Sequence, residues 1–372
     1  MSRRYKYLGL GLLVALATLI PGGFVIPRLL PPDKLGPIVF VTFLWLGLLF
    51  YLVLAFGLVD LGRMSLKLWR RLHRSNKSSA KEDSVEEPPE SVGLNRRAFL
   101  ARLTAGTAIA SSGVISLVGI HSAFGEFDTP EVPVSLKRLP RAFSGFRIVL
   151  LSDLHLGPLL GSEFVERVVE KTNALNPDLI AITGDLVDMP VDLLGNEIQG
   201  LSKLQAPRGV FFVTGNHEYF HGVEQWIDFI RGLGINVLAN QCVGIGDPDE
   251  PAFDLVGIHD RSAAYFNPSY KPDLKRALTN HVQDRELILL AHQPKQINDS
   301  DGMKIGLQLS GHTHGGQIWP FGGLTLFAQP YLSGLHQHDQ HRQIYVTRGT
   351  GFWGPPIRVL APPEITSIIL TT

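Results

Sequence analysis

The sequence predicts an α/β domain that follows membrane-spanning helices. Two apolar runs, each long enough to cross a bilayer, occupy the first part of the chain. From about residue 145, short β-branched runs alternate with amphipathic helical segments, which is the pattern of α/β domains. Metal-ligating residue types follow five of these runs. These observations predict a soluble catalytic or binding domain held at a membrane.

The apolar residues that make up 45% of this 372-residue chain are concentrated near its beginning. We predict two transmembrane helices within residues 1–61, at 8–30 and 37–61. The second prediction is the stronger one, because Pro21 and two following glycines interrupt the first run. Neither run has a charged residue at its middle, so no intramembrane transport pathway is expected.

Basic residues beside the two runs predict their orientation. Three basic residues precede the first run, whereas only Arg28 and Lys34 lie in the connection between the runs. The stretch RMSLKLWRRLHRSNKSSAK follows the second run and is strongly basic. We therefore expect the N-terminus and the segment 62–97 to be cytoplasmic, with a Ser-, Glu- and Pro-rich disordered linker at 75–95.

The segment 98–120 has two interpretations. Arg96 and Arg97 followed by a weakly apolar stretch resemble a twin-arginine export signal, and an ordinary third span is the alternative. No cleavage pattern stands beside His121, so we expect the anchor to be retained. Both interpretations place the connector 121–144 and the domain 145–372 on the extracytoplasmic face of the inner membrane.

Composition argues against two other classes of function. The formal net charge is zero, and the domain has no basic stripe with interleaved aromatic residues, so nucleic acid is not an expected partner. The single cysteine, Cys242, cannot form an internal disulfide or a cysteine-based metal site, and we interpret it as a small buried apolar residue.

The predicted elements of the domain follow in order. Strand 146–153 precedes a helix at 162–176, for which Ser162 is the expected N-cap. Two strands at 178–185 and 209–218 lead to a helix at 221–234 that Gly234 closes. The later predicted strands are 253–258, 286–292, 306–312, 343–349 and 364–370.

Polar clusters stand at the ends of five predicted strands. They read SDLHLG, TGDLVD, TGNHE, AHQP and SGHTHGG. Loops at the carboxyl ends of strands in open α/β sheets converge on one crevice. The convergence would bring together Asp153, His155, Asp185, Asn216, His217, His292, His312 and His314.

This set of residue types indicates a metal site with two ions. A single Asp or His at a strand end is often just a hydrogen-bonded buried residue, but residues of metal-ligating type follow five strands here. Crowded carboxylates repel unless cations neutralise them. Carboxylate, imidazole and amide ligands without thiolate suit divalent Mn, Fe, Co, Zn or Ni. Eight ligand-type residues are too many for one ion, whereas two ions about 3.5–4 Å apart that share a carboxylate would use them.

The ordered motifs D-x-H-x-G, G-D-x-x-D, G-N-H-E, the AHQP histidine and G-H-T-H-G-G resemble those of the calcineurin-like metallophosphoesterases. Within that superfamily the chain is most similar to the bacterial membrane-anchored branch, whose closing motif is matched by Gly349, Gly351, Arg358 and 363–365. The resemblance implies a sandwich of two mixed β-sheets flanked by helices.

The resemblance also implies a role for each motif residue. One metal ion would be held by Asp153, His155 and His314, the other by Asn216, His292 and His312, and Asp185 would bridge them. His217 would face the substrate and protonate the leaving oxygen. Asp188 and Glu218 would orient ligands from a second layer, with a surface or capping role as the alternative.

The function implied is a membrane-anchored phosphoesterase that hydrolyses a phosphodiester, pyrophosphate or phosphomonoester by metal-activated hydroxide, with manganese as the first choice of ion. A lipid-linked or envelope substrate, and so a role in lipid metabolism, is suggested by the anchor and by the aromatic stretches GQIWPFGG and AAYFNPSY, for which core packing is the alternative. The alternative function is a membrane-tethered metal-binding or sensor module without turnover.

Substrate choice is expected to lie in the loops 187–207, 240–270 and 315–341, whose sequences carry no recognisable signature. His336, His338 and His341 are expected in a solvated loop at the rim of the site.

Overall fold

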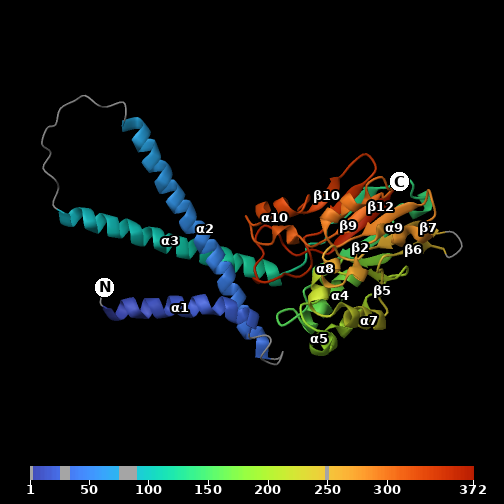
Figure 1. Cartoon of the computed structure of the whole chain (residues 1–372), viewed down its shortest axis with the longest axis horizontal. Helices are drawn as coiled ribbons and strands as arrows, with labels where there is room; N and C mark the ends of the chain where they lie inside the picture. Colours follow the sequence, from blue (N-terminus) through green and yellow to red (C-terminus); the bar gives the residue numbers. More distant parts are fainter. Residues whose placement is uncertain (1–2, 26–33, 75–89, 248–250) are drawn as a thin grey trace.

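The computed structural model describes residues 3–25, 34–74, 90–247 and 251–372, and it confirms the predicted fold class. Three long helices precede two six-stranded mixed sheets (Figure 1). The helices are α1 (Arg3–Val25), α2 (Leu35–Arg74) and α3 (Glu90–Phe124). Residues 26–30 of the first predicted span and residues 75–89 of the predicted linker lie outside the described residues.

Two of the described helices are long and apolar enough to cross a membrane, over Leu35–His73 and Ala98–Phe124. The basic stretch after the second apolar run continues α2 to Arg74 without a break. The prediction of a linker up to residue 95 was wrong at its end, because α3 begins at Glu90. The last helix-breaking prolines of that segment stand at 88 and 89, directly before this start.

The first sheet has the strand order β1-β12-β2-β3-β4-β5. Its strands β2, β3, β4 and β5 are parallel, whereas β12 runs antiparallel to β2 and parallel to β1. Their bounds are β1 (Glu131–Ser135), β2 (Arg147–Leu151), β3 (Leu179–Ile182), β4 (Val210–Phe212), β5 (Asn236–Val237) and β12 (Thr366–Thr371).

The second sheet has the order β10-β11-β9-β8-β7-β6, with antiparallel pairs only at its two edges. Its strands are β6 (Gln241–Gly246), β7 (Pro251–Gly257), β8 (Glu286–Leu290), β9 (Leu307–Ser310), β10 (Gly334–Gln337) and β11 (Gln343–Val346).

Several local predictions were wrong. The segment 121–144 is more than a connector, because it contains β1, whose Val134 is fully buried where β1 pairs with β12. The segment 209–218 is a strand only to Phe212, and α6 (Asn216–Phe220) follows Gly215. The N-cap of α4 is Gly161 instead of Ser162, and Glu197 accepts a hydrogen bond from the backbone N–H of Ser162.

The core lies between the two sheets and under the helices. Ile148 and Leu150 of β2 share one buried cluster with Leu255, Leu290 and Leu309 of the second sheet. A second cluster joins the other face of the first sheet to α4 (Ser162–Ala174), α5 (Val191–Ile198) and α7 (Val223–Gly232). The remaining short helices are α8 (Ala263–Phe266), α9 (Leu274–Ala277) and α10 (Gly322–Ala328).

The domain packs directly on α2 and α3. Ile357 is fully buried, and a Cβ atom added to Gly47 or Gly119 would clash with its side chain. The carbonyl of Gly119 also accepts a hydrogen bond of 2.9 Å from the backbone N–H of Arg358. Glycine at these two positions leaves room for the close approach of Ile357.

This contact predicts opposite effects for two glycines of one helix. Gly119→Ala should lower the stability of the full chain by about 1–3 kcal/mol, because the added methyl group overpacks a filled contact. Thermal unfolding in detergent micelles measures the change.

Gly113→Ala is the matched control, because nothing lies within 4 Å of its position. It should leave the midpoint unchanged or raise it, as alanine is the better helix former. Equal midpoints for the two variants would contradict the packing described for Ile357.

Candidate metal centre

The five predicted polar clusters meet where the carboxyl ends of strands from both sheets face each other. The loops after β2, β3 and β4 come from the first sheet, and the loops after β8 and β9 come from the second. The first sheet supplies both candidate aspartate ligands and the second supplies three candidate histidine ligands. The site therefore depends on how the two sheets are packed.

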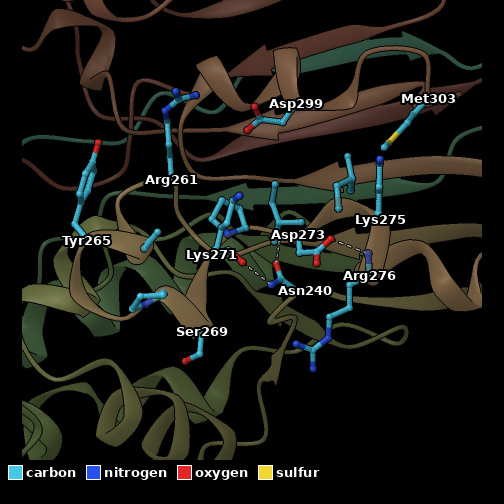
Figure 2. Close-up of a pocket in the computed structure, with 15 residues that line it drawn as sticks. Asn240, Arg261, Tyr265, Ser269, Lys271, Asp273, Lys275, Arg276, Asp299 and Met303 are labelled. Carbon is cyan, nitrogen blue, oxygen red and sulfur yellow. Dashed lines mark hydrogen bonds between the residues drawn. The ribbon is translucent and has the colours of Figure 1, made fainter.

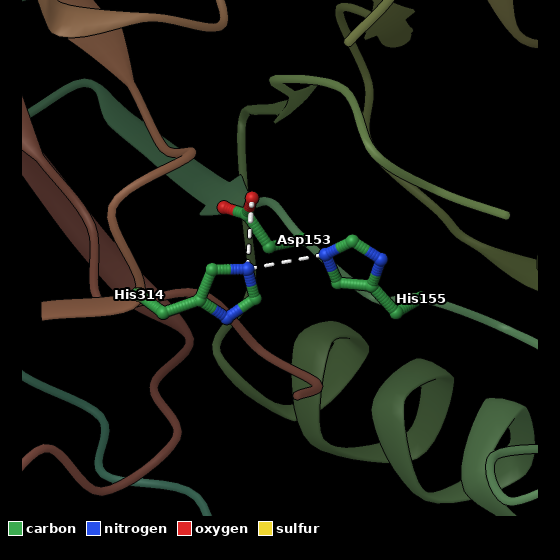
Figure 3. Close-up of side chains that lie close together, drawn as sticks. All are labelled: Asp153, His155 and His314. Atoms are coloured by element: carbon green, nitrogen blue, oxygen red, sulfur yellow. Dashed lines mark hydrogen bonds and ion pairs between the residues drawn. The ribbon is translucent and has the colours of Figure 1, made fainter. Parts of the chain in front are cut away.

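One cluster consists of Asp153, His155 and His314, whose ligand atoms lie within 4.8 Å of one another (Figure 3). The Nε2 atoms of the two histidines are 3.1 Å apart, and His314 Nε2 lies 3.5 Å from Asp153 Oδ1. All three residues are buried. Two imidazole nitrogens and a carboxylate oxygen converging in this way suit a divalent transition-metal ion.

An adjoining cluster consists of Asp185, His292 and His312. Asp185 Oδ2 lies 3.2 Å from His292 Nε2, which is itself 3.1 Å from His312 Nδ1. The same Oδ2 atom lies 3.9 Å from His155 Nε2 of the first cluster. Asp185 is thus the carboxylate that stands between the two clusters.

Asn216 has an unsatisfied polar atom beside this pair of clusters. Its Oδ1 atom is buried and finds no hydrogen-bond partner among the described residues. The backbone N–H of the next residue, His217, donates to Asp185 Oδ1 at 2.8 Å. A buried amide oxygen without a partner is costly, and coordination to a cation would satisfy it.

Hydrogen bonds orient the ligand histidines. His155 Nδ1 bonds Asp188 Oδ1 at 2.8 Å, and His292 Nδ1 donates to the carbonyl oxygen of Thr183 at 2.7 Å. Each bond leaves the Nε2 atom of that ring directed into its cluster, with its lone pair free for a metal ion. The Thr183 carbonyl was missed by sequence reasoning, because a backbone acceptor leaves no signal in residue type.

Asp188 also contacts the candidate acid. Its Oδ1 atom lies 2.6 Å from His217 Nδ1, so one carboxylate faces two imidazole rings. Burial alone would lower the pKa of His217, but Asp185 and Asp188 outweigh burial and raise that pKa to about 9. The exposed ring of Trp353 packs edge-on against His217, with the centroids 5.7 Å apart.

Glu218 ties two of the loops together. Its fully buried carboxylate accepts hydrogen bonds from the backbone N–H groups of Asp185, Leu186 and Gly215. Burial and the neighbouring Asp185 raise the pKa of Glu218 to about 7. Glu218 thus combines the capping role with a positioning role, since it holds the backbone on both sides of the Asp185 carboxylate.

The ligand loops have strained backbones. Five candidate ligands adopt positive φ angles between 46° and 70°, a region that residues with side chains rarely occupy: Asp153, His155, Asp185, His312 and His314. Such conformations cost about 1–3 kcal/mol each and persist where the surroundings impose them. Gly311 shows the crowding, because a Cβ atom there would clash with the Asp153 carboxylate.

Arg358 has a structural role that its place in the closing motif did not reveal. Its buried guanidinium donates to the carbonyl oxygens of Gly351, Ala361 and Arg348. It also lies 3.4 Å from both the Nδ1 atom and the carbonyl oxygen of His314. It therefore supports the loop that carries His314.

His221 is a further histidine of the site that sequence reasoning missed. Together with Asp188 and His217 it forms another group of metal-ligating type among the described residues. Burial lowers the pKa of His221. Its only sequence signal is its position four residues after His217 at the end of a short helix, which is too common to have identified it.

Of the three histidines of GLHQHDQH, only His336 lies in a strand instead of the predicted loop. Residues 334–337 form the edge strand β10 instead of a loop. His336 bonds the Ser333 carbonyl and His338 bonds the Tyr331 hydroxyl, whereas His341 is exposed. Pairing with β11 makes this stretch a strand, although its polar composition favours a loop.

A cavity of about 790 Å³ is lined mainly by the loop that follows β7 and by α9 (Figure 2). It is lined by four cationic side chains: Arg261, Lys271, Lys275 and Arg276. The loop 240–270 supplies Arg261 and also Tyr265, which is 90% exposed. None of the candidate metal ligands lines the cavity.

Fold and site together define a two-sheet α/β protein with adjoining His and Asp clusters of the kind that hold two metal ions. The sequence profile described as "Calcineurin-like phosphoesterase" matches residues 146–316. The chain belongs to the calcineurin-like phosphoesterase family.

Its relatives come from bacteria and eukaryotes, a wider range than the bacterial branch that the motifs suggested. A metallophosphoesterase of Helicobacter pylori is 40% identical over 66% of this chain, which spans only 65% of that relative's length. The "Transmembrane protein with metallophosphoesterase domain" of Danio rerio is 34% identical over 88% of this chain and 74% of its own. A metallophosphoesterase of Aquifex aeolicus is 32% identical over 64% of this chain and 89% of its own.

The Asp188–His155 hydrogen bond predicts an effect on metal affinity. Asp188→Asn should weaken the binding of manganese by about 10–100-fold, because the ring of His155 loses the carboxylate that orients it. Isothermal titration of the metal-stripped full chain measures the affinity.

Asp228→Asn is the control, since its side chain is 83% exposed on α7. It should bind manganese as the wild type does. An unchanged affinity in Asp188→Asn would show that Asp188 does not support a ligand.

Proposed function

We propose that this protein is a membrane-anchored phosphoester hydrolase with a dimetal centre. The observation that carries the proposal is the position of the Asp185 carboxylate between two candidate ligand clusters. Asp153, His155 and His314 would hold one ion, Asn216, His292 and His312 the other, and Asp185 both. Manganese is the preferred ion, with iron, zinc, cobalt and nickel as alternatives.

Bound divalent cations would neutralise the charge of the phosphoryl group and supply hydroxide from water near neutral pH. The residues of the chain provide the rest. His217 would donate a proton to the leaving oxygen from Nε2, while its Nδ1 atom faces Asp188 at 2.6 Å. Asp188 and Glu218 would hold His217 and the Asp185 backbone in place. The edge-on packing of Trp353 limits the rotation of the His217 ring.

The substrate proposed is a lipid-linked or envelope phosphoester. Two features support this: helices α2 and α3 are able to cross a bilayer, and the domain packs on both of them. In the proposed topology the spans lie in the inner membrane and the domain faces away from the cytoplasm, because basic residues cluster on α2 after Asp60.

The alternative is a membrane-tethered metal-binding or sensor module with this fold and no turnover. The complete ligand set and the carboxylate-held His217 favour an enzyme, because a binding module has no need of a proton donor. In the enzyme, the loops 187–207, 240–270 and 315–341 would select the ester.

Hydrolysis by the detergent-solubilised full chain tests the proposal. We expect turnover of a generic phosphodiester or phosphomonoester to disappear on metal removal and to return with manganese. His217→Ala should lower kcat by about 10²–10⁴-fold while metal binding persists, since it removes only the acid. Asp185→Asn should abolish turnover and lower the number of bound ions.

His341→Ala is the matched control, because His341 is exposed and its side chain lies outside the ligand clusters. It should keep full activity. Two bound ions without hydrolysis of either a soluble or a lipid phosphoester would favour the binding module.

A further inference from the structure

The segment around α10 exposes an unusually apolar surface. Residues 316–328 carry no charged side chain. The large apolar side chains exposed in this segment are Trp319 (61%), Phe321 (44%), Leu324 (60%), Leu326 (52%) and Phe327 (90%), and Leu360 (80%) joins them. We call these six residues the α10 face. Soluble surfaces rarely gather large apolar side chains in this way unless something covers them.

The α10 face lies beside α2 at the level of its apolar run. The ring of Phe321 packs edge-on against Phe50, with the centroids 6.3 Å apart. The first charged residue of α2 is Asp60. At 1.5 Å per residue, Phe50 is about 22 Å from the start of α2 at Leu35 and about 15 Å from Asp60. The contact thus falls inside the apolar run and not beyond its end.

Leu360 belongs to the same surface although it lies far away in sequence. The backbone N–H of its neighbour Val359 donates to the Gln317 carbonyl at 2.8 Å, and Ile318 forms a bridge with Val359. Ile357, two residues earlier, is the side chain that packs on Gly47 and Gly119. The α10 face is therefore continuous with the surface by which the domain contacts α2 and α3.

We propose that the α10 face is embedded in the apolar layer of the lipid bilayer, as a membrane contact of the catalytic domain additional to the spans. If α2 crosses a bilayer, Phe50 lies within the apolar layer, and Phe321, which contacts Phe50, must lie at the same depth. The backbone of α10 suits this environment, because it is helical and the N–H groups of Thr325 and Gln329 bond the carbonyls of Phe321 and Thr325. Lipid acyl chains would cover both the apolar run of α2 and this face.

The embedded face would set the position of the metal centre. Gly316 lies two residues after His314 and packs so closely on Gly322 of α10 that an added Cβ atom would clash with the Gly322 Cα. The ligand loop is thereby fixed to the apolar surface. If the protein hydrolyses phosphoesters as proposed above, this arrangement holds the metal centre where the phosphate of a membrane lipid can reach it.

Fluorescence quenching in vesicles tests the embedding without requiring turnover. In the full chain with Cys242→Ser, a single cysteine would replace Phe327, and an environment-sensitive fluorophore would be attached to it. The protein would be reconstituted into vesicles of phosphatidylethanolamine and phosphatidylglycerol. The two quenchers are lipid with a nitroxide on its acyl chain and iodide on both sides of the membrane.

Val282→Cys is the matched control, because Val282 is 48% exposed and lies shortly before β8, at the end of the sheet away from the metal centre. We expect nitroxide lipid to quench the label at 327 severalfold more than the label at 282, and iodide to show the reverse order. Leu324→Cys, at a second position of the face, should behave like Phe327→Cys.

Equal iodide quenching at 327 and 282, without quenching by nitroxide lipid, would overturn the proposal. So would oxidant-induced disulfide dimers of the unlabelled Phe327→Cys variant at low protein-to-lipid ratio, since they would show a second copy on the face. Embedding without phosphoester hydrolysis would leave this inference standing and overturn only the proposed function.

Discussion

The structure depends on burying two aspartates and four histidines, with a fifth histidine partly buried, where the carboxyl ends of strands from two sheets meet. Each charged group pays a desolvation cost, and Asp153 and Asp185 also repel each other. The fold offsets this with the histidines opposite them and with backbone donors such as the N–H groups of His312 and His217. A cation bound between the clusters would complete the compensation.

The positive φ angles of the ligands belong to the same constraint. Loops that turn sharply at a strand end bring short side chains back over the sheet edge, and the left-handed region is the backbone conformation that does so. The strain is maintained by packing from behind. Glu218 holds the loop of Asp185, and Arg358 supports the loop of His314.

The apolar helices enter this network through one loop. Ile357 fills the space left by Gly47 and Gly119, and the next residue, Arg358, reaches the His314 backbone and ring. Ile357 contacts α3 and the adjacent residue Arg358 contacts His314, so α3 and the candidate metal centre are linked through two consecutive residues. The spans are therefore part of the support of the site as well as candidates for its anchor.

The sequence by itself determined the chemistry of the site, because each cluster directly follows an apolar run whose β-branched pattern identifies a strand. For this reason Asp153, Asp185, His292 and the GHTHGG histidines were predicted together, and the predicted strands after residue 145 were found, though β4 is shorter. The strands β1, β5, β6 and β10 were missed. Proline in β1, glycines in β6, polar residues in β10 and the two-residue length of β5 weaken the local signal, so pairing with neighbours defines them. Only the tertiary structure decided which atoms face one another. The hydrogen bond of His292 to the Thr183 carbonyl, the Asp188 carboxylate shared by two histidines and the contact of Ile357 with two distant glycines are examples. All three arise from packing between segments that no local sequence pattern connects.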